Sequence, residues 1–417
     1  KIKNIIGSSP IIWLFFAFLF LYQFLLQSSP SVMVSSLVKH FNTSELGVSF
    51  LASSFFYTYA TLQIPAGILV DRCNIKYIFI VGLAILSLAS IYFAHSNSFQ
   101  SAMLTRIIMG IAALPGLVGT LYVANQWFPK KHFALFVGLT EMVGLLGAAF
   151  GQTILAQGVI HFGWQNTLTT MGIAGLLVTF VGAFIVRENP KVKHREKLKK
   201  ARGDYANANS FLKDLGYLLS SPYVWVSGIV CGIGFAIVSA FAGFWCIPFL
   251  VNKFSFSLGH AAMLSALVFA SAGISTPLLG SLASKIDNKS GVMMWGFVML
   301  GLLFLPIVFF MHLPAAVIII LLCGIGFLSG ISVLPFAMVR AIVPNHINAT
   351  AMGATNMLCV IIGAPILQPL IGSILHAGRS SGLSTAHSYS IAMSLMAVAM
   401  FASAVLCLWL KRLEPRL

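Results

Sequence analysis

The sequence predicts an all-α integral membrane protein with twelve transmembrane helices in two six-helix bundles. Of its 417 residues, 59% are hydrophobic and only 8% are charged, whereas a soluble domain carries about 25% charged residues. At about 20 apolar residues per span, plus short connections, the chain has room for roughly a dozen spans. One long polar segment divides them. We therefore predict a first bundle at 1–186, a basic connector at 187–220 and a second bundle at 221–417.

The apolar runs place the individual spans, and turn residues or charges separate one run from the next. Because each run is long enough to cross a bilayer as a helix, we assign one span to each. The predicted spans are 11–37, 46–70, 77–95, 100–126, 132–158, 164–186, 221–252, 260–284, 292–311, 313–342, 347–376 and 386–410.

The distribution of basic residues predicts the orientation. The formal net charge is +16, and twenty of the 25 lysines and arginines fall in the even-numbered connections and the two tails. The outer loops hold only Lys39, Lys253 and Arg379. This is the positive-inside pattern, so both termini and the connector are expected in the cytoplasm. The basic charge then points to contact with anionic membrane lipids, and not to nucleic acid.

The sequence argues against several other function classes. The six cysteines are scattered without a CxxC pair, so we expect neither a metal site nor a disulfide framework. No stretch resembles a nucleotide-binding loop, which disfavours a nucleotide cofactor and ATP-driven transport. A membrane enzyme would need several His, Asp or Glu residues at one interface, and the sequence shows no such cluster. We therefore predict a monomer that is not an enzyme and holds no cofactor.

The two halves repeat each other. The segment GILVDRCNIK at 67–76 has a counterpart, GSLASKIDNK, at 280–289, with a glycine and two basic residues at matching positions. A second match relates Pro129, Gly138 and Glu141 to residues 215 positions later. Offsets this similar indicate an internal duplication. Six spans per repeat give both halves the same orientation, and a site near the midplane between them is then expected.

The segment at 67–76 resembles the loop between helices 2 and 3 of the major facilitator superfamily, and the resemblance extends over all twelve spans. The resemblance implies that the aspartate of this loop acts on the start of helix 11 and holds a cytoplasmic gate closed. Asn74 stands where the family usually has glycine, and asparagine can adopt the left-handed conformation of a tight turn. The predicted gating residues are Gly67, Asp71, Arg72 and Lys76.

Two further stretches extend this resemblance. Arg106 and Gly110 are similar to the family's helix 4 motif, and a glycine ladder at 138–151 is of the kind that lets membrane helices approach closely. The ladder lacks the Gly-Pro pair of drug/proton antiporters. The stretch from Leu114 into helix 5 resembles bacterial solute permeases, including organic-anion symporters and phagosomal nutrient transporters. The resemblance implies secondary active transport across the inner membrane.

Two charges are predicted deep in the membrane, Arg106 and Glu141. With about 1.5 Å of rise per residue, Glu141 lies about 17 Å from the turn at Pro129 and Arg106 about 35 Å from it. Glu141 is the only acidic residue inside a span. Because burial favours a neutral carboxyl, we predict that Glu141 is the proton-coupling residue. The alternatives are a structural carboxyl at Glu141 and an arginine that snorkels outward at Arg106.

Other polar side chains inside the spans complete a candidate cavity. Amides recognise both carboxylates and hydroxyls, although a single amide in a span is more often a contact between helices. Gln23 and Gln27 share a face of helix 1, as Tyr59 and Gln63 do in helix 2. The predicted substrate-binding residues are Arg106, Gln23, Gln27, Tyr59, Trp245, Asn356 and Gln368.

The leading hypothesis is a proton-coupled secondary transporter that takes up a small polar solute. An amino acid, a short peptide or an organic anion would each suit a cavity with one arginine and one carboxyl. The alternatives are an exporter of drugs or siderophores and a membrane receptor that transports nothing. Flux into liposomes separates the receptor from both transporters.

Overall fold

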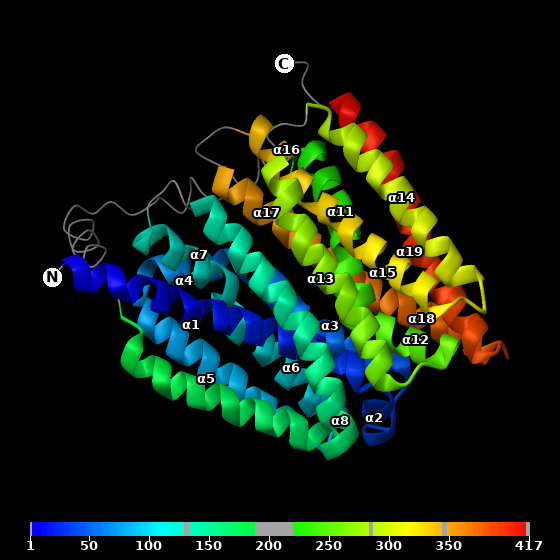
Figure 1. Ribbon diagram of the computed structural model, residues 1–417, viewed down its shortest axis with the longest axis horizontal. Helices are drawn as coiled ribbons and strands as arrows, with labels where there is room; N and C mark the ends of the chain where they lie inside the picture. The colour runs from blue at the N-terminus through cyan, green and yellow to red at the C-terminus, as the bar shows by residue number, and fades with distance from the viewer. Residues whose placement is uncertain (1, 129–132, 188–219, 283–286, 344–347, 414–417) are drawn as a thin grey trace.

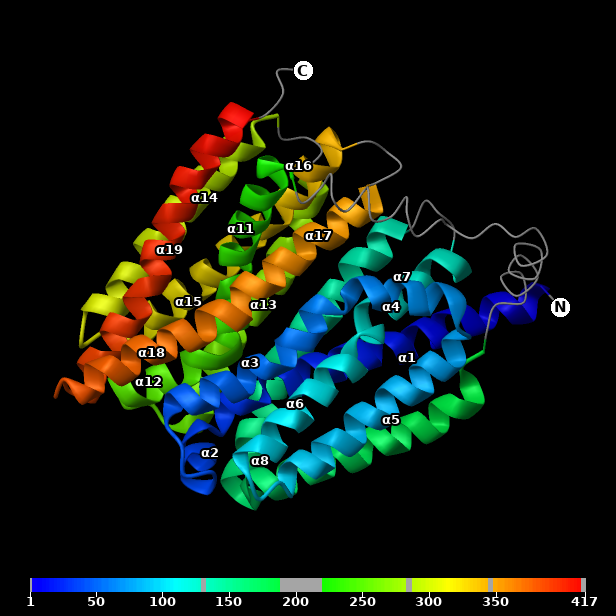
Figure 2. The ribbon, with the colours of Figure 1, turned by 180° about the vertical axis from the view of Figure 1, so that it is seen from behind.

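The computed structural model describes residues 2–128, 133–187, 220–282, 287–343 and 348–413. The described part is helical and contains no strand. The expected basic connector lies outside the described residues, except for its ends. In Figures 1 and 2 the helices before it and the helices after it form two groups that lie side by side.

The first group carries the first six predicted spans. Span 1 is α1 with a short 3-10 turn, span 2 is divided into α3 and α4, and span 4 into α6 and α7. Spans 5 and 6 together form α8, and the chain reverses direction between them at Gly163, where φ is +77°. The elements are α1 (Ile2–Ser28), η1 (Ser29–Val32), α2 (Val34–His40), α3 (Glu45–Thr61), α4 (Gln63–Arg72), α5 (Ile75–Ala94), α6 (Phe99–Ala113), α7 (Pro115–Trp127) and α8 (Phe133–Ile185).

The second group carries the other six spans, and three of them are interrupted. Span 7 contains a π-helical segment, η3, between α11 and α12, and span 11 contains a second one, η6. The elements are α11 (Pro222–Ala236), η3 (Ile237–Trp245), α12 (Cys246–Phe254), α13 (Leu258–Leu282), α14 (Lys289–Phe309), α15 (Ala315–Ser329), η4 (Gly330–Val333), α16 (Leu334–Ile342), α17 (Asn348–Ile361), η6 (Ile362–Ile366), α18 (Leu367–Ser380) and α19 (Thr385–Leu413).

Several of these breaks occur at prolines, which lack the N–H that continues a helix. Pro115 begins α7 directly after the break at Leu114, and Pro335 lies in the first turn of α16. Pro365 lies inside η6. The predicted spans are therefore correct in extent, but their segmentation was not expected.

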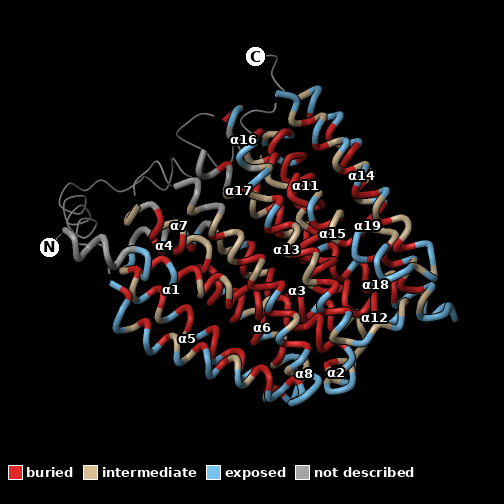
Figure 3. The backbone as a smooth tube through the Cα atoms, viewed as in Figure 1, coloured by how far each residue is buried: buried red, intermediate tan, exposed pale blue. Residues whose placement is uncertain are grey.

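Within the part of the chain that the structure describes, ten helical stretches are long and apolar enough to cross a membrane. One of them, Leu139–Ile185, contains two spans, and the divided span of α3 and α4 is not among them. Counting both gives the twelve spans predicted. Large apolar side chains are exposed along the outer helices, such as Phe180 and Phe184 on α8, and Figure 3 shows the buried residues between the helices. An apolar outer surface of this kind faces lipid.

The two groups meet through α8 and α13 and through the contact of α3 with α17 and α18. We call the end of the molecule that carries α2, the turn within α8 and the α18–α19 connection the distal end, because Figures 1 and 2 show it away from both chain ends. Lys253, expected in an outer loop, is buried at this end. Its Nζ donates to the carbonyls of Ile307 (2.8 Å) and Val308 at the end of α14.

Asn74 corrects one expectation from the sequence. Its φ of −65° and ψ of 121° are extended, not left-handed. Its side chain instead caps α5 by accepting a hydrogen bond from the backbone N–H of Lys76 at 2.9 Å. An asparagine that caps a helix does not need the left-handed conformation that glycine would supply. The side chains of Asp71 and Arg72, the surroundings of Gly67 and residues 344–347 directly before α17 lie outside the described part of the chain.

Candidate functional site

A cluster of polar side chains lies where α1, α3 and α8 face the second group of helices. We call Gln23, Tyr59 and Glu141 the central cluster. Gln23 and Tyr59 are buried, whereas Glu141, which lies in the part of α8 that forms span 5, keeps intermediate exposure. The charge of Glu141 is within electrostatic range of Tyr59 in the first group and of Cys359 in the second. The predicted proton site therefore lies between the two groups.

Gln23 is the member of this cluster with unmet hydrogen bonds. Its side chain is fully buried and close enough to the Tyr59 hydroxyl to interact with it, but neither Nε2 nor Oε1 meets the distance and angle of a hydrogen bond with any described residue. Gly116 on α7 makes room for it, because a Cβ there would lie 2.2 Å from the Gln23 Oε1. A buried polar atom without a partner costs about 1–3 kcal/mol. A bound solute or an ordered water would remove that cost.

Arg106 differs from its predicted role as a substrate-binding residue. Its side chain is 1% exposed, and the guanidinium donates to three backbone carbonyls, those of Leu26 (2.9 Å), Gln27 (3.1 Å) and Ala52 (3.2 Å). It also lies over the ring of Phe55, 5.1 Å from the centroid. Because α1 ends at Ser28, the first two carbonyls belong to its last turn, where helical N–H partners run out. Arg106 thus joins α1, α3 and α6, and does not point into an open cavity.

Two other predicted substrate-binding residues are also bonded to protein groups. The Trp245 indole is fully buried, and its Nε1 donates to the carbonyl of Gln368 at 3.0 Å. The Gln368 side chain donates to the carbonyl of Ser239 (2.8 Å) and accepts from the Ser53 hydroxyl (3.2 Å). These contacts use most of the hydrogen-bonding capacity of both side chains, so little of it is available to a solute in this conformation.

The remaining predicted residues lie closer to the meeting of the two groups. Asn356 on α17 donates a hydrogen bond to the Gln63 side chain on α4, which links the two groups directly. Gln27 has intermediate exposure, and its carbonyl is bonded by Arg106. Of the predicted residues, Asn356 and Gln368 therefore hydrogen-bond across the interface of the two groups.

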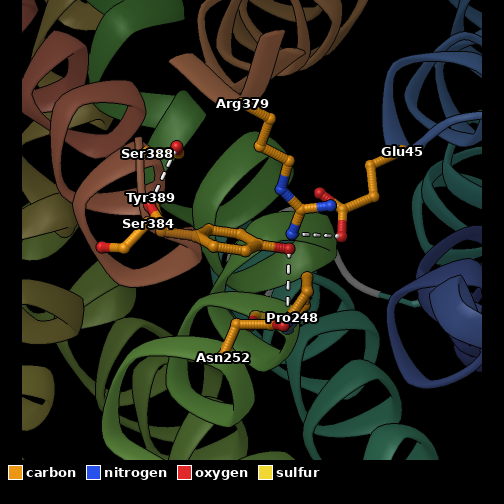
Figure 4. Close-up of polar contacts among 7 residues, drawn as sticks. All are labelled: Glu45, Pro248, Asn252, Arg379, Ser384, Ser388 and Tyr389. Carbon is orange, nitrogen blue, oxygen red and sulfur yellow. Dashed lines mark hydrogen bonds and ion pairs between the residues drawn. The ribbon is translucent and has the colours of Figure 1, made fainter. Parts of the chain in front are cut away.

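Sequence reasoning missed an ion pair that joins the two groups at the distal end. Arg379 Nη2 lies 3.1 Å from Glu45 Oε1, and its guanidinium lies 5.6 Å from the ring centroid of Tyr389. Figure 4 shows the four side chains together, with Asn252 donating to the Tyr389 hydroxyl at 3.4 Å. From the sequence, both charges could be placed only in loops. No sequence feature indicates that α3 lies beside α18.

The ion pair leads to a prediction of how the stability of the protein depends on pH. Burial raises the pKa of Glu45 above its ordinary 4.5, and the nearby charge of Arg379 opposes this rise only in part. The folded protein thus binds this proton more tightly than the unfolded chain does. The stability that Glu45 contributes is present at low pH and is lost as pH rises through the raised pKa. Glu45→Gln should flatten the fall of the unfolding temperature with pH just above 4.5.

The measurement is thermal unfolding in detergent across that pH range. Asn42→Gln, a nearby substitution without a charge, serves as the control and should keep the wild-type slope. Because the pair is partly solvated, its loss should change stability at neutral pH by no more than about 1 kcal/mol. An unchanged slope in Glu45→Gln would show that Glu45 does not titrate in this way.

Comparison with known proteins supports the fold and gives the chemical context. The family model described as the Major Facilitator Superfamily matches residues 14–365 and 236–417. A probable L-galactonate transporter of Escherichia coli is 28% identical over 50% of this chain and 45% of its own length. A hexuronate transporter of Bacillus subtilis is 26% identical over 43% of each chain. The matched parts thus span less than half the length of these curated relatives.

Among solved structures, a bacterial homologue of the human lysosomal transporter Spinster, in an inward-facing and unoccupied conformation, is similar throughout. It has a TM-score of 0.79 and 18% sequence identity, and the match covers 98% of both chains. At this identity the likeness shows the fold alone.

Proposed function

The chain belongs to the Major Facilitator Superfamily, and we propose that it is a proton-coupled secondary transporter that takes up a small polar solute across the inner membrane. The observation that carries the proposal is the position of Glu141. It is a carboxyl in the middle of a span, partly exposed, and in electrostatic range of both groups of helices. A proton site in such a place can be exposed to either side as the halves move.

The coupling follows from the cost of a charge in the membrane interior. An unpaired carboxylate beside a bound solute, away from water, is costly, so the carrier with bound solute changes conformation only after Glu141 has taken up a proton, and the empty carrier returns after both have left. A solute that binds beside the protonated carboxyl crosses with it. Release of the proton on the cytoplasmic side then recharges Glu141 and weakens solute binding. In this scheme each solute crosses with a proton.

Solute recognition is assigned to the amides and hydroxyl near Glu141. Gln23 supplies an amide whose donors and acceptor are unmet among the described residues, and Tyr59 supplies the neighbouring hydroxyl. Gln27 and Asn356 extend this surface. Such groups suit amino acids, short peptides and organic acids alike. The similarity to a probable L-galactonate transporter and a hexuronate transporter favours organic acids among these classes.

The same proposal includes a monomer with both termini in the cytoplasm, as the basic charge of the connections predicts. The distal end then faces outward, and its closed contacts separate Glu141 from the outside. Gly67, Asp71, Arg72 and Lys76 remain proposed residues of the opposite, cytoplasmic gate.

Transport in proteoliposomes tests this function. Radiolabelled galactonate, glucuronate, single amino acids and dipeptides would be offered in counterflow without a gradient, and then with an acidic exterior. We expect at least one of these solutes to exchange and to accumulate under the acidic gradient, while protein-free liposomes accumulate none. Exchange of none of these would favour the receptor, and an efflux that is driven by the gradient would favour the exporter.

A further inference from the structure

The distal end is closed by hydrogen bonds between buried amides and the π-helical segment η3. Gln152 of α8 donates from Nε2 to the carbonyl of Ala242 at 2.8 Å, and it donates to the Ser31 hydroxyl at 3.1 Å. The amide is fully buried. A π-helical segment inside an α-helix changes the pattern of backbone hydrogen bonds and is frequent at functional sites. The bond from Gln152 to Ala242 therefore ties α8 of the first group to an irregular part of the second.

Both partners of this bond have another hydrogen bond within their own group of helices. The Ala242 carbonyl also accepts from the Ser265 hydroxyl of α13 at 3.0 Å, and a carbonyl oxygen can accept two hydrogen bonds. Gln152 Nε2 also holds Ser31, which belongs to its own group. If the two groups separate here, neither Nε2 nor the Ala242 carbonyl loses its last partner.

The second polar contact at this level has the same construction. The Ser53 hydroxyl reaches Gln368 Oε1 of the other group at 3.2 Å, and it reaches the carbonyl of Ser49 on its own helix at 2.5 Å. Gln368 in turn keeps its bond to the Ser239 carbonyl of η3 at 2.8 Å. The hydroxyl has one proton, which can turn to Ser49 when the groups separate.

The contact between Asn356 and Gln63 is built differently. It also joins the two groups, but among the described residues neither side chain has a second hydrogen bond within its own group. Breaking it leaves two amides to find new partners. A second hydrogen bond within one group is therefore a feature of the Gln152 and Ser53 contacts, and not of every polar contact between the groups.

We propose that Gln152, Ser265 and the Ala242 carbonyl form a releasable gate at the distal end. Gln152 holds the gate closed, and Ser265 lowers the cost of opening it by keeping the Ala242 carbonyl bonded. This inference rests on the proposed function, because a gate has meaning only in a protein whose halves move apart. The proposal gives Gln152 and Ser265 opposite effects on gate opening, although both side chains bond the carbonyl oxygen of Ala242.

The two substitutions are expected to change the fraction of open molecules in opposite directions. Gln152→Leu removes a bond that exists only in the closed state, so it raises the open fraction. Ser265→Ala leaves the Ala242 carbonyl without a side-chain donor only when the gate is open, so it lowers the open fraction. A neutral hydrogen bond contributes about 0.5–1.5 kcal/mol, so the ratio of open to closed should change by about two- to thirteenfold in each direction.

The experiment measures the distance across the distal end in liposomes by double electron–electron resonance. Spin labels are placed at Lys39→Cys on α2 and Leu383→Cys beyond α18, two exposed positions of different groups. Cys73 and Cys323, the two cysteines that are not buried, are replaced by serine. Thr153→Val and Ser271→Ala are the matched controls, because within the described part of the chain these hydroxyls bond only to carbonyls of their own helices.

We expect Gln152→Leu to enlarge the long-distance population and Ser265→Ala to reduce it, while both controls match the parent protein. Shifts of the same sign, or no shift in Ser265→Ala, would overturn the gate even if the protein transports a solute. A parent protein that keeps one distance at every pH and exchanges no solute would instead contradict the proposed function. A thermal unfolding curve for each variant identifies any loss of folding.

Discussion

Glu141→Gln should abolish accumulation driven by a proton gradient and leave counterflow of the same solute intact. The amide has nearly the shape of the protonated carboxyl but cannot release a proton. If Glu141 couples transport, the variant carries solute in both directions and no longer responds to the gradient. We expect accumulation above the external concentration to fall to the level without a gradient, while exchange stays within about threefold of the wild type, since about 0.7 kcal/mol corresponds to that factor.

Thr140→Val is the matched control for this variant. Thr140 precedes Glu141 on α8, is buried, and bonds only to the carbonyl of Phe136 on its own helix at 2.7 Å. It should keep both activities. The comparison is made in proteoliposomes with an acidic exterior and again without a gradient. Accumulation by Glu141→Gln would exclude Glu141 as the coupling residue, and loss of both activities would assign it a structural role.

Arg106→Leu should destabilise the protein far more than the removal of an exposed arginine does. The guanidinium holds carbonyls of two helices in the membrane interior, and hydrogen bonds from a charged donor contribute about 1.5–3 kcal/mol each. We expect a loss of at least about 3 kcal/mol in the free energy of unfolding. Arg106→Lys should recover only part of it, because an ammonium cannot reproduce the fork of donors that reaches three carbonyls.

Thermal unfolding in detergent measures this effect, and Arg379→Leu is the comparison. Arg379 is 38% exposed and forms one ion pair, so its loss should cost no more than about 1 kcal/mol. If Arg106→Leu is as stable as the wild type but fails to bind a transported solute, then Arg106 is a binding residue and the structural role of its three hydrogen bonds is wrong.

The transmembrane organisation was predictable because hydropathy is a property of the chain itself. A span needs a run of apolar residues whatever its neighbours are, and the predicted spans agree with the helices even where α3 and α4 divide one of them. The segmentation of span 7 was not predictable in the same way. The residues of η3, IVSAFAGFW, are as apolar as those of a regular helix, and the bonds that Gln152, Ser265 and Gln368 make to them depend on which helices are neighbours.

Part of the site could be predicted from the sequence and part could not, and the difference has a physical reason. Glu141 could be singled out because an acidic residue within a span is costly wherever it lies. The partner of a polar group is a different matter, since it depends on which helices are neighbours. Arg106 has the same sequence signal as a substrate-binding arginine, yet the end of α1 and the middle of α3 supply carbonyls that occupy it.

The sequence by itself determined the membrane class, the number and extent of the spans, the repeat and the one central carboxyl. Each of these depends on composition or spacing, which the unfolded chain already contains. The tertiary structure alone decided that Gln23 has no partner among the described residues, that Glu45 meets Arg379, and that Gln152 reaches Ala242, 90 positions away. A hydrogen bond needs its two atoms within about 3 Å of each other, and only the packing of the helices brings them that close.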